Sequence, residues 1–485
     1  MAVTKPVQKE NFTVQKLLVD GQWIEGKGAT LPVIDKYRLE PGAHVKAADR
    51  EQVAHAIACA HAAFRAGAPV PFERGAVLER AAAMMEGRLD DFVRTMQMEA
   101  GFTVSDATGE VRRCIQTLKL SAEEARRMAG EVVPLAGAPQ QSGRLGFTLR
   151  VPLGVVVAIT PFNSPLNTVA HKIAPAFAAG NAVILKPSSN TPLTACKLAE
   201  VLLDAGLPRG FLSVLHGSGE MAGWLLADER VRFFAFTGST EVGRKIQQAA
   251  GLRRTQMELG SIACTIVCDD ARLDTALTKI VNASYRKAGQ VCTSIQLLLV
   301  QKKILNEVQT RLAKLVAELP YGDPRDPKTV VGPLISEREA IRVESWIAEA
   351  VAKGAKCLAG GGARKGAVVP PALLASVDET MKVGCQEIFG PVLCIVPFET
   401  LDAAIARVNS TPFGLACGIF TNRLDDAFAA ARRLEVGGVH VNETSSSRVD
   451  LMPYGGSKDS GFGREGPRYA VHEMTEERIV TFTTS

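Results

Sequence analysis

The apolar positions from residue 151 onward form short continuous runs separated by amphipathic stretches. Four such runs precede Glu258, and each ends at a Gly, Pro or Thr that favours a turn; they cover residues 154–159, 182–185, 211–215 and 233–236. Continuous apolar runs of this length predict buried parallel strands, and the longer amphipathic stretches between them, such as residues 191–205, predict helices. The repeated order of strand, turn and helix predicts a parallel sheet covered on both faces.

The carboxyl ends of these predicted strands carry the polar residues of most interest. Ligands bind at that edge of an open parallel sheet. The residues that the pattern places there are Asn163, Lys186, Gly217 and Gly238.

A second strand–helix series follows Glu258 and predicts a second α/β unit, with apolar runs at residues 265–267, 297–300, 392–397, 418–420 and 438–441. The chain up to about Arg127 is predicted to be rich in helix, with helices over residues 49–64 and 76–98. Residues 130–151 predict a long hairpin, and residues 478–484 alternate as an edge strand does. Exposed strand edges pair readily with other chains, so we expect both pieces to form a subunit contact.

Composition narrows the class of protein. A length of 485 residues indicates two or three domains, and the net charge of +5 arises from mixed signs without a basic block, which makes nucleic acid an unexpected partner. Neither an apolar run of about 18 residues nor an apolar signal region in residues 1–12 is present, so no membrane span or secretion is expected. Ten cysteines without a CxxC motif or zinc spacing predict free thiols in a reducing compartment, the cytoplasm, and no metal site.

The segment from Tyr285 to Ser294 carries the most chemistry. It places the thiol of Cys292 just after a Gly–Gln pair, and a thiol attacks carbonyl carbon once it is ionised. A carboxylate at Glu258 and a side-chain amide at Asn163 complete a nucleophile, a general base and an oxyanion donor. These are the groups needed to oxidise an aldehyde.

Seven motifs in order along the chain now support a resemblance. The chain resembles the aldehyde dehydrogenase superfamily over nearly its whole length, in particular the branch of lactaldehyde, succinate semialdehyde and phosphonoacetaldehyde dehydrogenases. The motifs lie at residues 161–163, 186–189, 236–243, 258–260, 289–292, 387–391 and 453–465. The resemblance implies a Rossmann-like cofactor domain (residues 1–128 and 149–257), an α/β catalytic domain (258–470) and a small β oligomerisation element (129–148 and 471–485) in a homodimer or homotetramer.

The resemblance implies a role for each candidate catalytic residue. Cys292 corresponds to the nucleophile, Asn163 to the oxyanion donor that acts with the Cys292 backbone N–H, and Glu258 to the base that activates water for hydrolysis of a thioester. The branch that transfers the acyl group to coenzyme A lacks this glutamate, so a free carboxylic acid is the expected product. Glu465 corresponds to a proton-relay position in some members, and a solvated surface charge is the alternative. Ser261 departs from the family, which commonly has a second glycine there.

The implied cofactor is NAD or NADP. Gly238, Ser239 and Gly243 lie where a strand leads into a helix, whose N-terminus favours the pyrophosphate. The resemblance adds Lys186 and Glu387 as contacts to the two riboses, and Phe389, Thr160 and Phe162 around the nicotinamide. NAD-preferring members often carry a glutamate where this chain has Ser189, and that carboxylate repels a 2′-phosphate. With a hydroxyl in its place, we expect NADP to be accepted.

The substrate is open between two classes. Arg286 matches an arginine that binds the distal carboxylate in succinate semialdehyde dehydrogenases, and a second arginine of those enzymes is replaced by His171. Arg448 is a further candidate cation, and the planar guanidinium suits carboxylate, phosphonate or sulfonate. A small anionic aldehyde is therefore favoured, with neutral aliphatic or aromatic aldehydes as the alternative if both arginines form structural salt bridges. A non-catalytic relative is disfavoured, because the thiol, base and oxyanion donor are all present.

Overall fold

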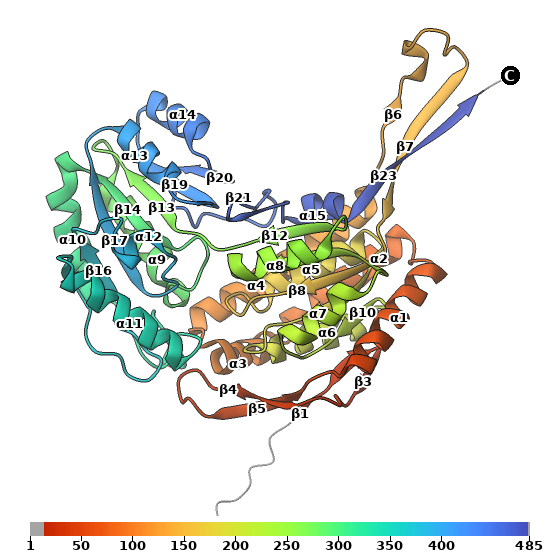
Figure 1. The fold of residues 1–485 in the computed structure, drawn as a ribbon, viewed down its shortest axis with the longest axis horizontal. Helices are drawn as coiled ribbons and strands as arrows, with labels where there is room; N and C mark the ends of the chain where they lie inside the picture. The colour runs from red at the N-terminus through yellow and green to blue at the C-terminus, as the bar shows by residue number, and fades with distance from the viewer. Residues whose placement is uncertain (1–13, 484–485) are drawn as a thin grey trace, which may run out of the picture.

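The computed structural model describes residues 14–483, and Figure 1 shows two sheet-containing bodies with a β arm that projects from one of them. Residues 1–12, in which the sequence shows no signal region, and Thr484, the last residue of the predicted tail strand, lie outside the described residues. In residues 14–483 no helix combines the length and the apolar character that a membrane span requires. Within the same range no cluster of three or more His, Cys, Asp or Glu side chains is suited to hold a metal ion.

The first body is built on an eight-stranded sheet in the order β22-β12-β11-β8-β9-β10-β2-β3. Its five central strands are parallel, and four of them match the predicted apolar runs, because strands buried on both faces need apolar side chains on both faces. The fifth, β12, was not predicted, because its sequence is largely polar. They are β8 (Val155–Ile159), β9 (Ala182–Lys186), β10 (Leu212–Val214), β11 (Val231–Thr237) and β12 (Arg254–Glu258). The connecting helices are α5 (Asn167–Ala178), α6 (Pro192–Asp204), α7 (Gly219–Ala227) and α8 (Thr240–Ala250).

The N-terminal region corrects two sequence-based expectations. It opens with strands rather than helices: β1 (Val14–Gln15), β2 (Leu17–Val19), β3 (Gln22–Ile24), β4 (Thr30–Ile34) and β5 (Pro41–Lys46). These strands were missed because they are short and contain many polar or turn-forming residues. The single helix predicted over residues 76–98 is two helices, α2 (Pro71–Glu86) and α3 (Leu89–Ala100), because the chain turns at Gly87 and Arg88; α1 (Arg50–Ala66) and α4 (Val104–Arg127) complete the set.

The second body has a seven-stranded sheet in the order β15-β16-β17-β14-β13-β19-β20. Its strands are β13 (Ala263–Val267), β14 (Ile295–Gln301), β15 (Lys356–Ala359), β16 (Ala372–Ala375), β17 (Val392–Phe398), β19 (Ala416–Phe420) and β20 (Gly438–Val441). Its main helices are α9 (Leu273–Tyr285), α10 (Leu305–Ala317), α11 (Glu337–Ala352), α13 (Leu401–Asn409) and α14 (Leu424–Arg433), with a short α12 (Lys382–Cys385). The α/β architecture predicted from the sequence is therefore confirmed.

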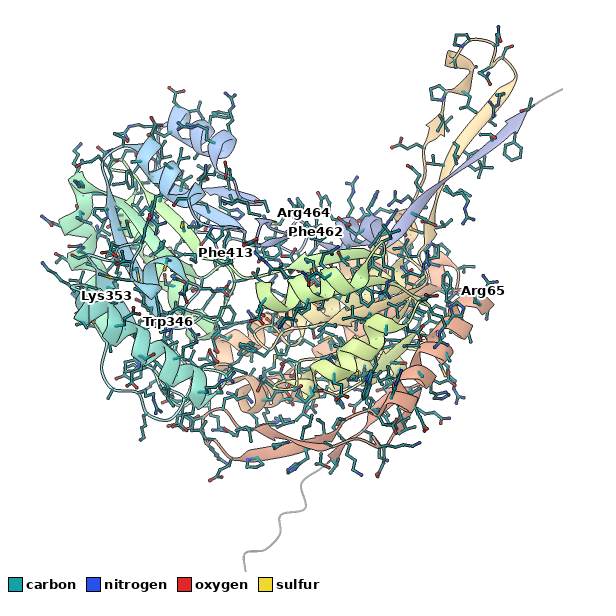
Figure 2. All side chains as sticks on the ribbon, in the orientation of Figure 1. Arg65, Trp346, Lys353, Phe413, Phe462 and Arg464 are labelled. Carbon is teal, nitrogen blue, oxygen red and sulfur yellow. The ribbon has the colours of Figure 1, made fainter. Side chains whose placement is uncertain are left out.

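The C-terminal segment returns from the second body to the first. After β18 (Phe413–Gly414) pairs with β21 (Ser457–Lys458), β22 (Gly461–Phe462) joins the edge of the first sheet beside β12. Figure 2 labels Phe462 and Arg464 near the middle of the molecule, on this crossing segment. Met474, at the end of α15 (Pro467–Glu473), belongs to the hydrophobic core of the first body. The division into the three predicted domains stays a prediction, to which the structure adds this return crossing.

The arm is a three-stranded sheet in the order β23-β7-β6. It consists of β6 (Val132–Val133), β7 (Arg144–Pro152) and β23 (Thr475–Thr483), and β23 pairs antiparallel with β7 along its whole length. The hairpin and the tail strand, both inferred from alternating apolar residues, therefore lie side by side in one projecting element (Figure 1). Several apolar side chains of the arm are exposed, namely those of Val132, Leu145, Leu149, Ile479 and Phe482.

Candidate active site

A cavity of about 1220 Å³ is lined by residues of both bodies, and it contains the three candidate catalytic residues. Glu258 is the last residue of β12, and Asn163 follows β8, so both come from the carboxyl edge of the first sheet. Cys292 precedes β14 of the second sheet. The fold thus brings together three residues that the sequence separates by up to 129 positions (292 minus 163).

The backbone before Cys292 adopts a conformation unusual for side chains other than glycine. Helix α9 ends at Tyr285, and Lys287, Ala288 and Gly289 then have φ of 50°, 52° and 70°. A Cβ at Gly289 would lie 2.0 Å from the Gly390 carbonyl oxygen, so only glycine fits there. The helix that precedes Arg286 therefore does not continue to Cys292. Consecutive left-handed residues are costly and persist only where their surroundings hold them.

Lys287 supplies much of that support. Its ammonium donates hydrogen bonds to Glu110 Oε2 on α4 at 2.7 Å and to the Asn163 carbonyl oxygen at 3.0 Å, and it lies 4.3 Å from the centroid of the Phe102 ring. Burial alone would raise the pKa of Glu110, but Lys287 and a hydrogen bond from Ser164 bring it down to about 2. A buried ion pair between the two bodies therefore holds the loop of the nucleophile.

Within residues 14–483 the Cys292 side chain makes one close polar contact, to a residue to which the sequence analysis assigned no role. Its Sγ lies 2.9 Å from the Tyr454 hydroxyl. Burial raises the pKa of the Cys292 thiol to about 11, although the Tyr454 hydrogen bond acts in the opposite direction. The only sequence signal for Tyr454 was its position within the motif at residues 453–456.

Asn163 is positioned by the backbone of the nucleophile loop. Its side-chain Nδ2 donates a hydrogen bond of 2.8 Å to the carbonyl oxygen of Gln290. An amide nitrogen carries two hydrogens, so a second donor remains for an oxyanion. The contact joins two loops whose residues lie 127 positions apart in the sequence.

Glu258 and Glu465 are two buried carboxyl groups whose pKa values are shifted in opposite directions. Neither Glu258 oxygen has a hydrogen-bond partner among residues 14–483, and burial, followed by the charge of Glu465, raises its pKa well above the usual range. Glu465 accepts hydrogen bonds from Lys172 Nζ at 3.0 Å and Arg448 Nη2 at 2.9 Å. Burial would raise the pKa of Glu465, but these cations bring it to about 2. When two carboxyl groups have pKa values shifted in opposite directions, the one with the raised pKa can act as a base while the other stays an anion. Glu465 is only 1 % exposed, so it is not the solvated surface charge considered as an alternative.

All of the predicted dinucleotide residues except Gly243 line the same cavity. The Lys186 ammonium, at the end of β9, has no hydrogen-bond or ion-pair partner in the described part of the chain, and burial lowers its pKa to about 8. The buried Thr160 hydroxyl is also unpartnered within residues 14–483. Such orphaned polar groups fit a polar ligand that supplies their hydrogen bonds.

The turn into α8 is shaped for close approach. Ser239 caps the helix, with its Oγ accepting from the Val242 N–H at 3.5 Å. A Cβ at Gly243 would lie 2.4 Å from Leu259 Cδ2, and one at Gly238 would lie 2.5 Å from the Phe236 ring. The glycines therefore allow tight packing of α8 at a helix N-terminus, where anions are favoured. Ser189 lies at the exposed rim, and its hydroxyl donates to the Gly217 carbonyl oxygen at 3.3 Å.

Glu387 and Phe389 face the cavity from the loop before β17. Glu387 Oε1 accepts a hydrogen bond of 2.8 Å from the Ser261 backbone N–H, and burial raises the pKa of Glu387 to about 7. Ser261 is thus accommodated without loss of this contact. Phe389, with φ of 49°, packs edge-to-face against Phe162 at 5.9 Å between ring centroids. Residues suited to both halves of a dinucleotide therefore line this cavity.

The three candidate substrate residues lie in different settings. Arg286 lines the cavity and donates to Ser446 Oγ at 3.1 Å, without an ion-pair partner in residues 14–483. Arg448 also lines the cavity, but its charge is paired with Glu465. His171 is buried outside the lining, with Nε2 2.8 Å from Asp450 Oδ1. Asp450 also accepts from Arg113, a cavity-lining arginine that the sequence had not indicated. Arg286 is thus the arginine of this group that is available to an anion.

Comparison with known proteins agrees with this geometry. The model of the aldehyde dehydrogenase family matches residues 23–480. A 3-sulfolactaldehyde dehydrogenase of Priestia aryabhattai is 46% identical over 465 residues, which cover 96% of this chain and 97% of that protein.

Solved structures superpose over nearly the whole chain. Aldehyde dehydrogenase 21 from Physcomitrella patens, in complex with the reaction product succinate, gives a TM-score of 0.95 at 38% identity, covering 98% of this chain and 99% of that one. A glyceraldehyde-3-phosphate dehydrogenase from Methanocaldococcus jannaschii, complexed with NADP, gives 0.90 at 36% identity, covering 94% and 99%. Together with the family match, these neighbours confirm the expectation of NAD or NADP as cofactor. The chain therefore belongs to the aldehyde dehydrogenase family.

Proposed function

We propose that this enzyme oxidises a small anionic aldehyde to the free carboxylic acid, with Cys292 as nucleophile and water as the final acyl acceptor. The observation that carries the proposal is one cavity lined by Cys292, Asn163, Glu258 and Arg286, whose guanidinium has no ion-pair partner in residues 14–483. A thiol, an amide donor, an unpartnered carboxyl group and a cation are the groups that such a reaction requires.

The first step forms a covalent bond to the substrate. Cys292 gives up its proton, the thiolate sulfur bonds to the aldehyde carbon, and the carbonyl π electrons move to oxygen. The free hydrogen of Asn163 Nδ2 stabilises that oxyanion, as does the Cys292 backbone N–H. Preorganised donors of this kind are worth about 10²–10³ in rate each. Glu258, a buried carboxyl group with a raised pKa, is suited to accept the thiol proton.

The dinucleotide, when bound, supplies the acceptor for the hydride that leaves the substrate carbon. Lys186, Ser189, Gly238, Ser239 and Gly243 hold its adenosine and pyrophosphate portion in this proposal. Glu387, Phe389, Thr160 and Phe162 orient the nicotinamide portion. Unlike a glutamate, the hydroxyl of Ser189 leaves room for a 2′-phosphate and does not repel it, so NADP is accepted.

The last step releases the acid. Glu258 takes a proton from water, the water oxygen bonds to the thioester carbon, and the carbon–sulfur bond breaks to return Cys292. The proton-relay role expected for Glu465 is not part of this proposal, because Lys172 and Arg448 hold it as an anion; its charge instead raises the pKa of Glu258. The raised pKa of Glu258 keeps it basic enough for this work near neutral pH.

The distal charge of the substrate meets Arg286. The three relatives described above carry names or ligands with a sulfonate, a carboxylate or a phosphate, which supports an anionic aldehyde here. In this scheme Arg286 and Ser446, 3.1 Å apart, bind the anion. Neither His171, which is buried outside the lining, nor Arg448, which is paired with Glu465, takes that role.

The enzyme is proposed to be a homodimer or homotetramer of the cytoplasm. The exposed apolar side chains of the arm and the open edge of β23 support the assembly. The ten cysteines, all of them free thiols in the structure, support a reducing compartment. Light scattering that gives a monomer at micromolar concentration would exclude the assembly.

A turnover panel tests the function. Anionic and neutral aldehydes are each offered with NAD and with NADP, in the absence of coenzyme A, and acid product and reduced dinucleotide are quantified. We expect acid formation in equal amounts with reduced dinucleotide, the highest kcat/KM for anionic aldehydes, and no turnover by Cys292→Ala. The function is wrong if Cys292→Ala retains normal turnover, and the substrate class is wrong if neutral aldehydes of equal length react as well.

A further inference from the structure

Tyr454 connects the thiol of Cys292 to a buried group of charged side chains. Its hydroxyl lies 2.9 Å from Cys292 Sγ, and the guanidinium carbon of Arg448 lies 3.7 Å from the centroid of its ring. Arg448 in turn donates to Glu465 at 2.9 Å. The phenol is thus the one hydroxyl in contact with the proposed nucleophile within residues 14–483.

The backbone holds Tyr454 in place independently of these contacts. The Tyr454 N–H donates to the Glu465 carbonyl oxygen at 3.1 Å, and the Glu465 N–H donates back to the Tyr454 carbonyl oxygen at 2.7 Å. Glu465 therefore fixes Tyr454 twice, through its own backbone and through the Arg448 side chain on the ring. A side chain locked from two directions cannot easily rotate away from Cys292.

We propose that Tyr454 is a catalytic residue whose hydroxyl donates a hydrogen bond to the Cys292 thiolate. The proposal rests on the function proposed above, in which Cys292 is the nucleophile. While both groups are protonated, either can donate. A thiolate carries no hydrogen, so after ionisation the contact persists only with the phenol as donor. A hydrogen bond to the charged form of a group favours that form.

Arg448 acts as a positioning residue in this arrangement. A guanidinium over the face of an aromatic ring is attracted by the π electrons and withdraws charge from the ring. The phenolic O–H then becomes a better donor. Arg448 can occupy this place because Glu465 binds its other edge. Arg448 therefore supports the hydrogen bond to the nucleophile and does not bind the substrate anion.

Burial and two nearby carboxyl groups oppose ionisation of Cys292, so a hydrogen-bond donor such as Tyr454 is needed to stabilise the thiolate. The carboxyl groups of Glu258, from β12, and Glu387, from the loop before β17, disfavour a second negative charge on the thiol. Arg448 and Arg286 favour it. Burial disfavours it most, and Tyr454 is the hydrogen-bond donor that opposes burial directly.

The test measures ionisation of the thiol without turnover. Wild type and Tyr454→Phe are treated with iodoacetamide between pH 6 and 10, and the rate of labelling is followed at the Cys292 peptide by mass spectrometry. Hydrogen bonds to charged groups correspond to about 10- to 100-fold in equilibrium, so we expect labelling at pH 8 to slow by about tenfold or more. The profile should move by about one pH unit or more to higher pH. Tyr321→Phe, at an exposed tyrosine, should match wild type.

Further variants keep the test decisive. Unchanged dinucleotide affinity shows that Tyr454→Phe is folded; should it not fold, Tyr454→Met also removes the hydroxyl and should give the same loss. Arg448→Lys keeps the charge beside Glu465 but not the planar contact, and it should move the profile in the same direction by less. A Tyr454→Phe profile identical to wild type overturns the role of Tyr454, and an unchanged Arg448→Lys profile overturns the role of Arg448.

Failure of this proposal is distinguishable from failure of the proposed function. If Cys292→Ala abolishes turnover while Tyr454→Phe leaves the labelling profile unchanged, the reaction stands and only the donor role falls. If Cys292→Ala keeps normal turnover, the nucleophile itself is wrong, whatever the labelling profile shows.

Discussion

The side chain of Asn163 donates a hydrogen bond of 2.8 Å to the carbonyl oxygen of Gln290, two residues before Cys292. The contact ties the loop after β8 in the first body to the loop before β14 in the second. It also aims the remaining amide hydrogen, since a planar amide held at one hydrogen has its other direction fixed.

Replacing Asn163 by Ala should therefore lower kcat by about 10²–10³ because one oxyanion donor is lost. Dinucleotide affinity, measured by fluorescence titration, should stay within about threefold of wild type. Asn306→Ala, at an exposed position of α10, serves as the control and should behave as wild type. A kcat within about threefold of wild type for Asn163→Ala would contradict the oxyanion role.

Glu258→Gln should separate the two halves of the reaction. Without a base for water, the thioester forms once and then persists, so stopped-flow absorbance should show one equivalent of reduced dinucleotide followed by turnover about 10²–10⁴ slower. The burst should also form more slowly than in wild type, because Glu258 is proposed to accept the thiol proton. A burst as fast as that of wild type would show that another group deprotonates Cys292.

The pH dependence of the wild-type enzyme follows from the same carboxyl group. Burial and the charge of Glu465 raise the pKa of Glu258, and only the ionised form acts as a base. We expect kcat to rise with pH through a value well above the ordinary 4.5 of a glutamate. The effect of Glu258 on stability has the opposite sign. Because burial raises its pKa, the folded state binds this proton more tightly than the unfolded state does, so the folded state loses stability as pH rises above 4.5. In Glu258→Gln, the pH dependence of the melting temperature should lose this contribution.

Ser189→Glu should convert the enzyme toward NAD. A carboxylate at this rim position repels the 2′-phosphate of NADP but can accept a hydrogen bond from the 2′-hydroxyl of NAD. We expect kcat/KM with NADP to fall by about tenfold or more, with NAD retained. Ser345→Glu, on the exposed side of α11, adds the same charge away from the cavity and should leave the ratio unchanged.

Arg286→Gln should remove selectivity for anionic aldehydes. A hydrogen bond from a charged donor is lost, so kcat/KM should fall by about 10- to 100-fold for an anionic aldehyde. Neutral aldehydes of equal length should react at nearly the wild-type rate. Arg432→Gln on the surface helix α14 is the matched control. Equal losses for both aldehyde classes would show that Arg286 supports the fold rather than the substrate.

Lys287→Met should destabilise the protein more than any of the changes above. It leaves Glu110 buried without its cation, and breaking a buried pair in this way costs about 3–5 kcal/mol. Wild-type stability should also fall as pH drops from the ordinary glutamate value of 4.5 toward about 2, where Glu110 becomes protonated. Denaturant unfolding measures both effects. Lys245→Met, in an exposed pair with Glu241, should change stability by less than about 0.5 kcal/mol.

The sequence predicted four of the five central strands of the first sheet, because burial requires apolar residues on both faces, but it missed the largely polar β12 that carries Glu258. It missed the strands of residues 14–46, which are short and partly polar, and it merged α2 with α3. Helical spacing continues through Gly87 because α2 and α3 both pack against α4, so the pattern does not register the break.

Within the site, the motifs identified the residues but not their partners. Cys292, Glu258 and Asn163 were named from motifs, whereas the contacts of Tyr454 with Cys292 and of Glu110 with Lys287 join positions 162 and 177 residues apart. A local pattern carries no information about such pairs. The pairing of Arg448 with Glu465 was equally invisible, although both residues had been singled out.

The strained turn at residues 287–289 shows that the second body depends on the first to hold the Cys292 loop. Its left-handed backbone is held by Glu110, Asn163 and Phe102, all contributed by the first half of the chain. The second body on its own would therefore carry Cys292 in a relaxed loop without the geometry of the intact protein. Recombining this half with the first half of a distant homologue should preserve the nucleophile only where those three supports are inherited with it.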